Sequence, residues 1–185
     1  MEIGLMRHYR VNHRFQRLSD AATFNRDMEI YNQADIVLPP GAHPMGNWDV
    51  CFTSAMKRAI ETGRHVFRGK IRVNNLLNEV PMHAGFRTRL KLPLFLWAFI
   101  ARAQWLIQSA RQKEGRDLTL SRARTFMSEF CVKENDDARI LVISHGFFLV
   151  VLRRVLRGFG FRGRAFLKAK NGRIYLFRIP STGVK

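Results

Sequence analysis

Acidic residues are scarce in this sequence. Its 185 residues include 14 Asp and Glu against 32 Lys and Arg, a formal net charge of +18 at pH 7. Residues 151–185 carry ten Lys and Arg and no acid at all. Such an excess favours an anionic partner, such as nucleic acid, anionic lipid or a polyphosphorylated substrate, without choosing among them. Because the cations are interleaved with apolar positions, a solvated basic surface explains them equally well.

Cysteine is nearly absent, and its two positions, Cys51 and Cys131, lie far apart in the chain. Two isolated cysteines do not make a disulfide framework, and no spacing of Cys and His indicates a zinc site. We therefore expect a reducing, cytoplasmic compartment, in which both thiols are packed inside the protein rather than reactive.

A secretory leader and long hydrophobic runs are also missing. The most apolar segment, residues 92–107, is interrupted by Pro93, Arg102 and Gln104. It is shorter than the roughly 20 residues that a spanning helix needs, so we expect no transmembrane segment. A partly buried helix is the favoured interpretation, and a helix lying on a membrane surface is the alternative.

Short apolar segments alternate with helical patterns along the chain. Strands are expected at residues 2–6, 49–53, 71–74 and 139–144, and helices at 19–31, from 54, at 93–113, at 121–132 and from 145. Segments 165–169 and 173–179 are expected to form a hairpin around the turn sequence KNG.

This alternation predicts a single α/β domain over residues 1–185. The expected architecture is a three-layer αβα sandwich, with a mostly parallel central sheet and an antiparallel edge strand. We also expect a helical insertion around residues 85–135, in a position to cap the active site.

Three predicted strands are followed by side chains suited to phosphate. Arg7 and His8 follow the first strand, His145 follows the strand RILVIS, and Arg58 comes soon after the strand DVCFT. Ligands of parallel sheets bind beyond the carboxyl ends of the strands, so we expect these side chains at one rim. Guanidinium forks match phosphoryl oxygens, and a neutral imidazole is a competent nucleophile towards phosphorus. A second, protonated imidazole can donate to the phosphoryl oxygens.

A leaving alkoxide also needs a proton. Glu79 is the only acidic residue between Glu61 and Glu114. A carboxylic acid at the rim can protonate the leaving oxygen and later take a proton from water, which makes Glu79 the candidate acid and base.

Four blocks of the sequence resemble, in order, the signatures of the histidine phosphatase superfamily, the phosphoglycerate mutase-like family. LMRHY resembles the Arg-His-Gly signature after the first strand, and FTSAMKRAIETG resembles the Ser-Ser-Pro-Leu-x-Arg-Ala block. LNEVPMHAGF is similar to the Leu-x-Glu block, and ILVISHGFFLVVLRRVL to the closing strand, Ser-His-Gly and helix. Together the blocks extend from residue 3 to about 156.

This resemblance implies a phosphomonoester hydrolase that acts through a covalent phosphohistidine. It implies that His8 accepts the phosphoryl group, that Arg7, Arg58 and His145 form the phosphate pocket, and that Glu79 is the acid and base. It also implies that the enzyme needs no metal and no organic cofactor.

The chain departs from the family pattern beside the predicted nucleophile. Tyr9 stands where the family has Gly and adds bulk next to His8. Arg10 replaces the usual acidic or polar residue, and Arg14 stands where many members carry Asn. Both arginines are candidate substrate contacts, and they predict a substrate with more than one phosphate or carboxylate.

Three alternatives stay open. A phosphoglycerate-mutase-like phosphotransferase returns the phosphoryl group to another substrate oxygen, but such enzymes carry extra segments for which this chain has little room. Relatives that act on phosphohistidine proteins are similarly short but often lack the Glu, so Glu79 favours a small phosphorylated substrate. Tyr9, Arg10 and the excess charge also fit a catalytically weak member that binds an acidic or nucleic-acid partner.

Overall fold

The computed structural model describes residues 1–41 and 45–180. Within these residues, six strands form one sheet in the order β5-β4-β6-β1-β8-β7. These strands are β1 (Glu2–Arg7), β4 (Val50–Thr53), β5 (Arg72–Val73), β6 (Arg139–Ser144), β7 (Arg162–Gly163) and β8 (Ile174–Arg178). β1, β4, β5 and β6 are parallel, whereas β8 runs antiparallel to β1 and to β7. The predicted α/β class with a mostly parallel sheet is confirmed.

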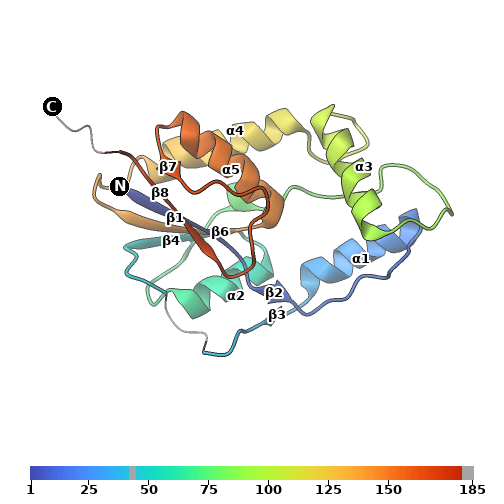
Figure 1. The fold of residues 1–185 in the computed structure, drawn as a ribbon, viewed down its shortest axis with the longest axis horizontal. Coiled ribbons are helices and arrows are strands. Elements are labelled where there is room, and N and C mark those ends of the chain that lie inside the picture. Colours follow the sequence, from blue (N-terminus) through green and yellow to red (C-terminus); the bar gives the residue numbers. More distant parts are fainter. Residues whose placement is uncertain (42–44, 181–185) are drawn as a thin grey trace.

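Helices cover both faces of this sheet (Figure 1). The α-helices of the described residues are α1 (Ala21–Gln33), α2 (Lys57–Val66), α3 (Leu94–Leu106), α4 (Arg116–Phe126) and α5 (Gly146–Gly158). α2 packs on one face through a cluster that includes Met6 and Cys51, and α4 and α5 pack on the other through a cluster that includes Ile3, Leu5 and Cys131. Because successive side chains of a strand point to opposite faces, β1 supplies both clusters. This arrangement is the predicted three-layer sandwich.

α1 and α3 lie beyond the carboxyl end of β1, and the small antiparallel ribbon of β2 (Arg10–Val11) and β3 (Ile36–Val37) lies next to α1 (Figure 1). Phe24 of α1 stacks on Trp97 of α3, with ring centroids 5.5 Å apart. The indole Nε1 of Trp97 donates to the carbonyl of Ser19 at 2.8 Å. These contacts form a separate apolar cluster, which holds the two helices beside the strand ends.

The predicted C-terminal hairpin is wrong. β8 pairs with Arg162–Gly163 rather than with residues 165–169. The carbonyl of Ala169 accepts from Nη1 of Arg7 at 3.2 Å, and the N–H of Gly172 donates to the carbonyl of Arg7 at 2.9 Å. The segment before β8 therefore forms hydrogen bonds with the end of β1 and does not form a hairpin with β8.

The helix expected from Ser54 begins only at Lys57. The N–H of Ser54 donates to the carbonyl of Ile143 at 3.0 Å, which extends the sheet by one more residue. The helix needs helical backbone angles, so it can begin only after this extended residue and the turn that follows.

The helices predicted at residues 93–113 and 121–132 also have different bounds in the structure. α3 ends at Leu106 instead of residue 113, just before Gln108, whose φ of 56° lies outside the right-handed helical region. α4 begins at Arg116 instead of residue 121, and a π-helical turn, Met127–Cys131, completes it.

Candidate active site

Three neighbouring strands end at the same level of the sheet. β1 and β4 both pair with β6 in parallel register. Beyond the strand ends, the N–H of His8 donates to the carbonyl of Ser144 at 3.0 Å, and Ser54 makes the equivalent bond to Ile143. The backbone therefore fixes where the following side chains emerge, including Arg58 on the first turn of α2.

Arg58 lies between the two predicted histidines. Its Nε is 3.2 Å from Nε2 of His8 and 3.2 Å from Nδ1 of His145. The two imidazole centroids are 5.1 Å apart, and all three residues are at most 1% exposed. A guanidinium N–H can only donate, so both histidine nitrogens turn lone pairs towards it.

A backbone carbonyl fixes the tautomer of His8. Its Nδ1 is 2.6 Å from the carbonyl oxygen of Tyr9, which can only accept, so Nδ1 carries the proton. Burial lowers the pKa of His8 to about 3, and the positive charge of Arg58 acts in the same direction. His8 is therefore a neutral imidazole with its free Nε2 lone pair directed towards Arg58.

His145 is held by a chain of hydrogen bonds from its other side. Its Nε2 is 2.7 Å from Oγ of Ser54, which in turn donates to Oδ1 of Asn78 at 2.9 Å. The N–H of Ala55 also donates to Oδ1 of Asn78, so this amide oxygen accepts and the Ser54 hydroxyl must accept from His145. Burial lowers the pKa of His145 well below its usual range, and the charge of Arg58 adds to this.

Arg7 supplies a second guanidinium at the same place. Its Nη1 donates to the carbonyl of Ala169, while its buried Nε has no hydrogen-bond partner in the described part of the chain. A Cβ on Gly146 would lie 3.2 Å from Cζ of Arg7, so glycine after His145 leaves room for the guanidinium. An unpaired buried donor is costly, and an anion would satisfy it.

Glu79 lies at the N-terminus of α5. Its Oε1 accepts from the N–H of Phe148 at 3.0 Å, and its Oε2 accepts from the N–H of Phe147 at 3.3 Å. The guanidinium of Arg102, which comes from α3, stacks 3.8 Å from the Phe147 ring and donates to the carbonyl of Val80 at 3.1 Å. Backbone donors of a helix N-terminus thus hold the carboxylate at the edge of the site.

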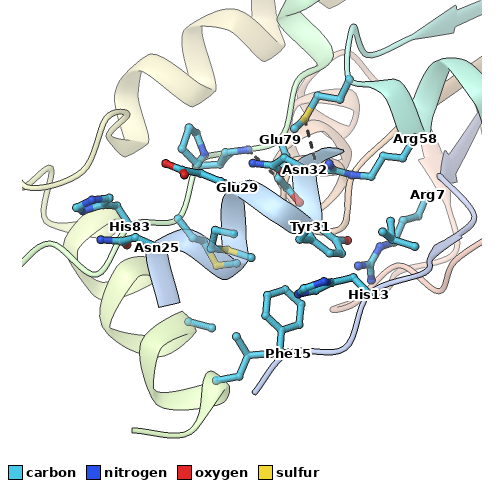
Figure 2. Close-up of a pocket in the computed structure, with 18 of the residues that line it drawn as sticks. Arg7, His13, Phe15, Asn25, Glu29, Tyr31, Asn32, Arg58, Glu79 and His83 are labelled. Atoms are coloured by element: carbon cyan, nitrogen blue, oxygen red, sulfur yellow. Dashed lines mark hydrogen bonds between the residues drawn. The ribbon is translucent and has the colours of Figure 1, made fainter. Parts of the chain in front are cut away.

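A cavity of about 560 Å³ opens next to these residues. Figure 2 shows Arg7 and Arg58 at one end and His83 and Asn25 at the other, with Glu79 along the wall. The remaining cations of the lining are Arg10, Lys113 and Lys168, and its apolar and aromatic side chains include Phe15, Met28, Tyr31, Met82 and Leu94. His8 and His145 are buried behind this lining.

The two candidate substrate contacts differ in position. Arg10 is exposed and lines the cavity, whereas Arg14 is exposed and does not line it. Tyr9 is only 5% exposed and lines a different cavity with Met45 and Gly172, so its bulk lies outside the space next to His8.

Several residues that support the site belong to no motif that marks them as functional. Asn78 acts on His145 through Ser54, Asn32 accepts from Nη1 of Arg58 at 3.1 Å, and Asn171 donates to the carbonyl of His8 at 2.8 Å. Asn78 directly precedes Glu79, so the same block could have indicated it. Asn32 and Asn171 come from segments without any recognisable motif.

Metal ligands are not gathered anywhere in residues 1–41 and 45–180, where no group of three or more His, Cys, Asp and Glu could hold an ion. Both cysteines are buried and free. Burial raises the pKa of Cys51 to about 12 and also raises the pKa of Cys131.

The fold belongs to a known class. A family model described as the histidine phosphatase superfamily (branch 1) matches residues 42–184. The match covers well over half of the chain, so the protein is a member of the histidine phosphatase superfamily, as its sequence blocks indicated. The matched span does not include Arg7 and His8, whose assignment rests on the first block and on the geometry.

Solved structures with the same fold share little sequence with this chain. A candidate alpha-ribazole-5'-P phosphatase from Escherichia coli K-12 is 17% identical, with a TM-score of 0.57 over 95% of this chain and 89% of that chain. The product of open reading frame Rv3214 from Mycobacterium tuberculosis is 13% identical, with a TM-score of 0.54 over 95% and 90%.

A phosphoserine phosphatase from Entamoeba histolytica, solved with 3-phosphoglyceric acid, is 14% identical, with a TM-score of 0.52 over 85% of this chain and 80% of that one. At such identities the likeness shows the fold alone. No curated protein sequence matches the chain.

Proposed function

We propose that the protein hydrolyses phosphomonoesters through a phosphohistidine on His8. The observation that carries this proposal is the position of the Arg58 Nε, which is 3.2 Å from Nε2 of His8 and 3.2 Å from Nδ1 of His145. A bound phosphoryl group would replace these nitrogens as the acceptor of the Arg58 N–H. It would also satisfy the unpaired Nε of Arg7.

The first half-reaction forms the phosphoenzyme. Nε2 of His8 attacks phosphorus while the bond from phosphorus to the ester oxygen breaks. Arg7 and Arg58 neutralise the phosphoryl oxygens. His145 takes up a proton from solvent on Nδ1 when the anionic substrate binds, donates from it to one of these oxygens, and releases the proton when phosphate leaves. Glu79 in its acid form gives its proton to the leaving oxygen, so that an alcohol departs.

The second half-reaction restores the enzyme. Glu79, now a carboxylate, takes a proton from water as the water oxygen attacks phosphorus. The bond from phosphorus to Nε2 breaks, inorganic phosphate leaves, and His8 returns to its neutral form. The Tyr9 carbonyl keeps the proton of His8 on Nδ1 throughout, because it accepts at 2.6 Å.

The cavity supports an anionic phosphorylated substrate of small size. Arg10, Lys113 and Lys168 line it beyond the two phosphate arginines. We propose Arg10 as a contact to a second anionic group, and Arg14 as a weaker one, since it is exposed outside the lining. The helical insertion is proposed to cap the site, because Leu94 of α3 lines the same cavity.

A single-turnover experiment tests this function. The protein is mixed with less than one equivalent of an aryl phosphate labelled at phosphorus, quenched in alkali and separated from free phosphate. We expect a base-stable, acid-labile phosphoenzyme that precedes release of inorganic phosphate. His8→Ala should remove it, whereas His65→Ala, an exposed histidine on α2, should not.

Two outcomes would overturn the proposal. Phosphate release by His8→Ala at the original rate would exclude the covalent step. Return of the label to a second oxygen of a diol monophosphate, with no phosphate released, would identify a phosphotransferase of the mutase type instead.

A further inference from the structure

α3 presents three different faces. Trp97 and Ala101 are buried against the protein, and Leu94 and Ala98 line the cavity. The remaining face is turned to solvent at the end of the molecule (Figure 1). No helix among the described residues is long and apolar enough to cross a membrane.

The solvent face of α3 is apolar. Phe95 and Phe99 are each 69% exposed, and Leu106 is 53% exposed. At about 100° per residue these three side chains fall within about 40° of one another around the helix axis. Leu90 before the helix and Ile107 after it are exposed as well, so we call these five residues the α3 ridge.

Cations flank the α3 ridge at both ends. Arg87, Arg89 and Lys91 precede the helix, Arg111 follows it, and all four are exposed. Between Glu61 and Glu114 the sequence contains a single acid, Glu79, and it lies at the N-terminus of α5 rather than on the ridge. The sequence around the ridge is therefore mostly cationic, and the nearby acid among the described residues is Asp20 at the N-terminus of α1, which interacts with Lys91 and leaves Arg87, Arg89 and Arg111 as the other cations.

We propose that the α3 ridge docks on the surface of an anionic lipid bilayer. Aromatic and aliphatic side chains flanked by cations are the pattern of a helix that lies in the membrane interface. The apolar residues enter the acyl boundary, and the arginines and lysine meet anionic headgroups. A second copy of the chain is a poor occupant, because docking would bring two cationic surfaces and two +18 chains together.

Docking by the ridge also positions the candidate active site. Leu94 and Ala98 line the cavity from the neighbouring side of the same helix, whose diameter with side chains is about 10–12 Å. The bound protein therefore keeps its cavity within about one helix diameter of the bilayer. This surface does not depend on the proposed activity and is tested without it.

Co-sedimentation with vesicles tests the ridge. The full chain is mixed with vesicles of phosphatidylcholine alone and of phosphatidylcholine with phosphatidylglycerol. We expect strong binding only to the anionic vesicles, weakened by salt. Phe95→Ser with Phe99→Ser should lower the partition coefficient about tenfold or more, since each phenylalanine loses its transfer into lipid.

Two control variants separate the ridge from general effects. Leu176→Ser removes an exposed apolar side chain from β8, at the other end of the molecule from α3, and should bind like the wild type (Figure 1). Replacement of Arg87, Arg89 and Lys91 by Gln should remove most of the salt dependence. Thermal unfolding of each variant checks that it is folded.

The proposal is overturned if the folded Phe95→Ser/Phe99→Ser variant binds anionic vesicles as well as the Leu176→Ser variant does. It is also overturned if the wild type ignores vesicles but forms a dimer that the same double variant dissociates. Equal binding to neutral and anionic vesicles would exclude the role of the flanking cations.

Discussion

The strand ends and the α1–α3 side of this protein are built on different principles. At the strand ends, His8, Arg58 and His145 are at most 1% exposed and are held by the parallel ladder and by one another. On the other side, α1 and α3 meet through apolar contacts such as Phe24 on Trp97, and α3 leaves Phe95 and Phe99 in solvent. The first region is organised for a fixed chemical geometry, and the second for contact with something outside the chain. Changes at the strand ends should therefore alter the chemical step, and changes on the helical side should alter binding.

The largest expected effect on the chemical step comes from Glu79→Gln. The amide keeps one oxygen, which can still accept from Phe148, but its NH2 group cannot accept from Phe147 and the side chain cannot supply a proton. For alkyl phosphates, whose leaving group needs protonation, we expect phosphoenzyme formation to slow by about 10²–10⁴-fold. Nitrophenyl phosphate, with a stable leaving anion, should lose much less in the same step.

The measurement is the single-turnover rate of phosphoenzyme formation with each substrate class. Arg102→Gln is a useful comparison, because Arg102 stacks on Phe147 beside Glu79 without carrying a transferable proton near neutral pH. Equal losses on alkyl and aryl substrates in Glu79→Gln would mean that another group is the acid.

Acid should destabilise the folded protein through the strand-end histidines. The folded pKa of His8, about 3, lies below its ordinary value of 6.5, so the unfolded chain binds the proton more readily. The resulting stability is complete above pH 6.5 and is lost as pH falls towards 3. At about 1.4 kcal/mol per pKa unit, His8 alone should cost about 3 kcal/mol between pH 7 and pH 4.

Urea unfolding at several pH values measures this loss. His145 shifts in the same direction, so replacing both histidines by Asn should flatten the pH dependence below pH 6.5 more than either single change. An unchanged slope in the double variant would show that other groups cause the acid sensitivity.

Asn78→Ala should have a smaller effect that still falls on the chemical step. Without the Asn78 oxygen, the Ser54 hydroxyl can turn and no longer needs to accept from His145. A lost buried hydrogen bond is worth about 1 kcal/mol, so kcat should fall about five- to tenfold with little change in KM. Asn78→Asp, which keeps the acceptor oxygen, should recover most of the rate. A rise in KM alone would place Asn78 in binding instead.

The smallest expected effect is on substrate capture at the cavity mouth. Exposed charges more than about 10 Å apart are screened at 0.1 M salt, so added salt should raise KM for an anionic substrate more than it lowers kcat. Arg10→Gln should raise KM a few-fold and reduce the salt dependence. Arg14→Gln should raise KM less, because Arg14 does not line the cavity. A larger rise in KM for Arg14→Gln than for Arg10→Gln would show that Arg14 is the main contact to the second anionic group.

The strand-end residues could be predicted because parallel pairing leaves the sequence little freedom. Once RILVIS and the first strand are neighbours, Arg7, His8 and His145 must emerge at one rim. The C-terminal segment could not be predicted in this way. Its turn sequence suits a hairpin, but Ala169 and Gly172 bond to Arg7 instead, a long-range contact that local sequence does not encode.

The supporting groups could not be predicted, for a related reason. Asn32 and Asn171 reach Arg58 and His8 from α1 and from the segment before β8, far away in the sequence. The sequence predicts that Tyr9 adds bulk next to His8, yet its side chain packs beside Gly172 and lines another cavity. A sequence pattern identifies the residue type, whereas the direction of its side chain depends on neighbours that only the fold brings near.

Each of the two buried thiols can report the opening of one helical layer of the sandwich. Cys51 lies in the α2 layer and Cys131 in the layer of α4 and α5. With their pKa values raised by burial, neither thiol reacts until its own layer opens. Native-state labelling by a thiol reagent, with the modified cysteine identified by mass, would therefore show which layer opens first and whether the sheet loses both layers in one cooperative event.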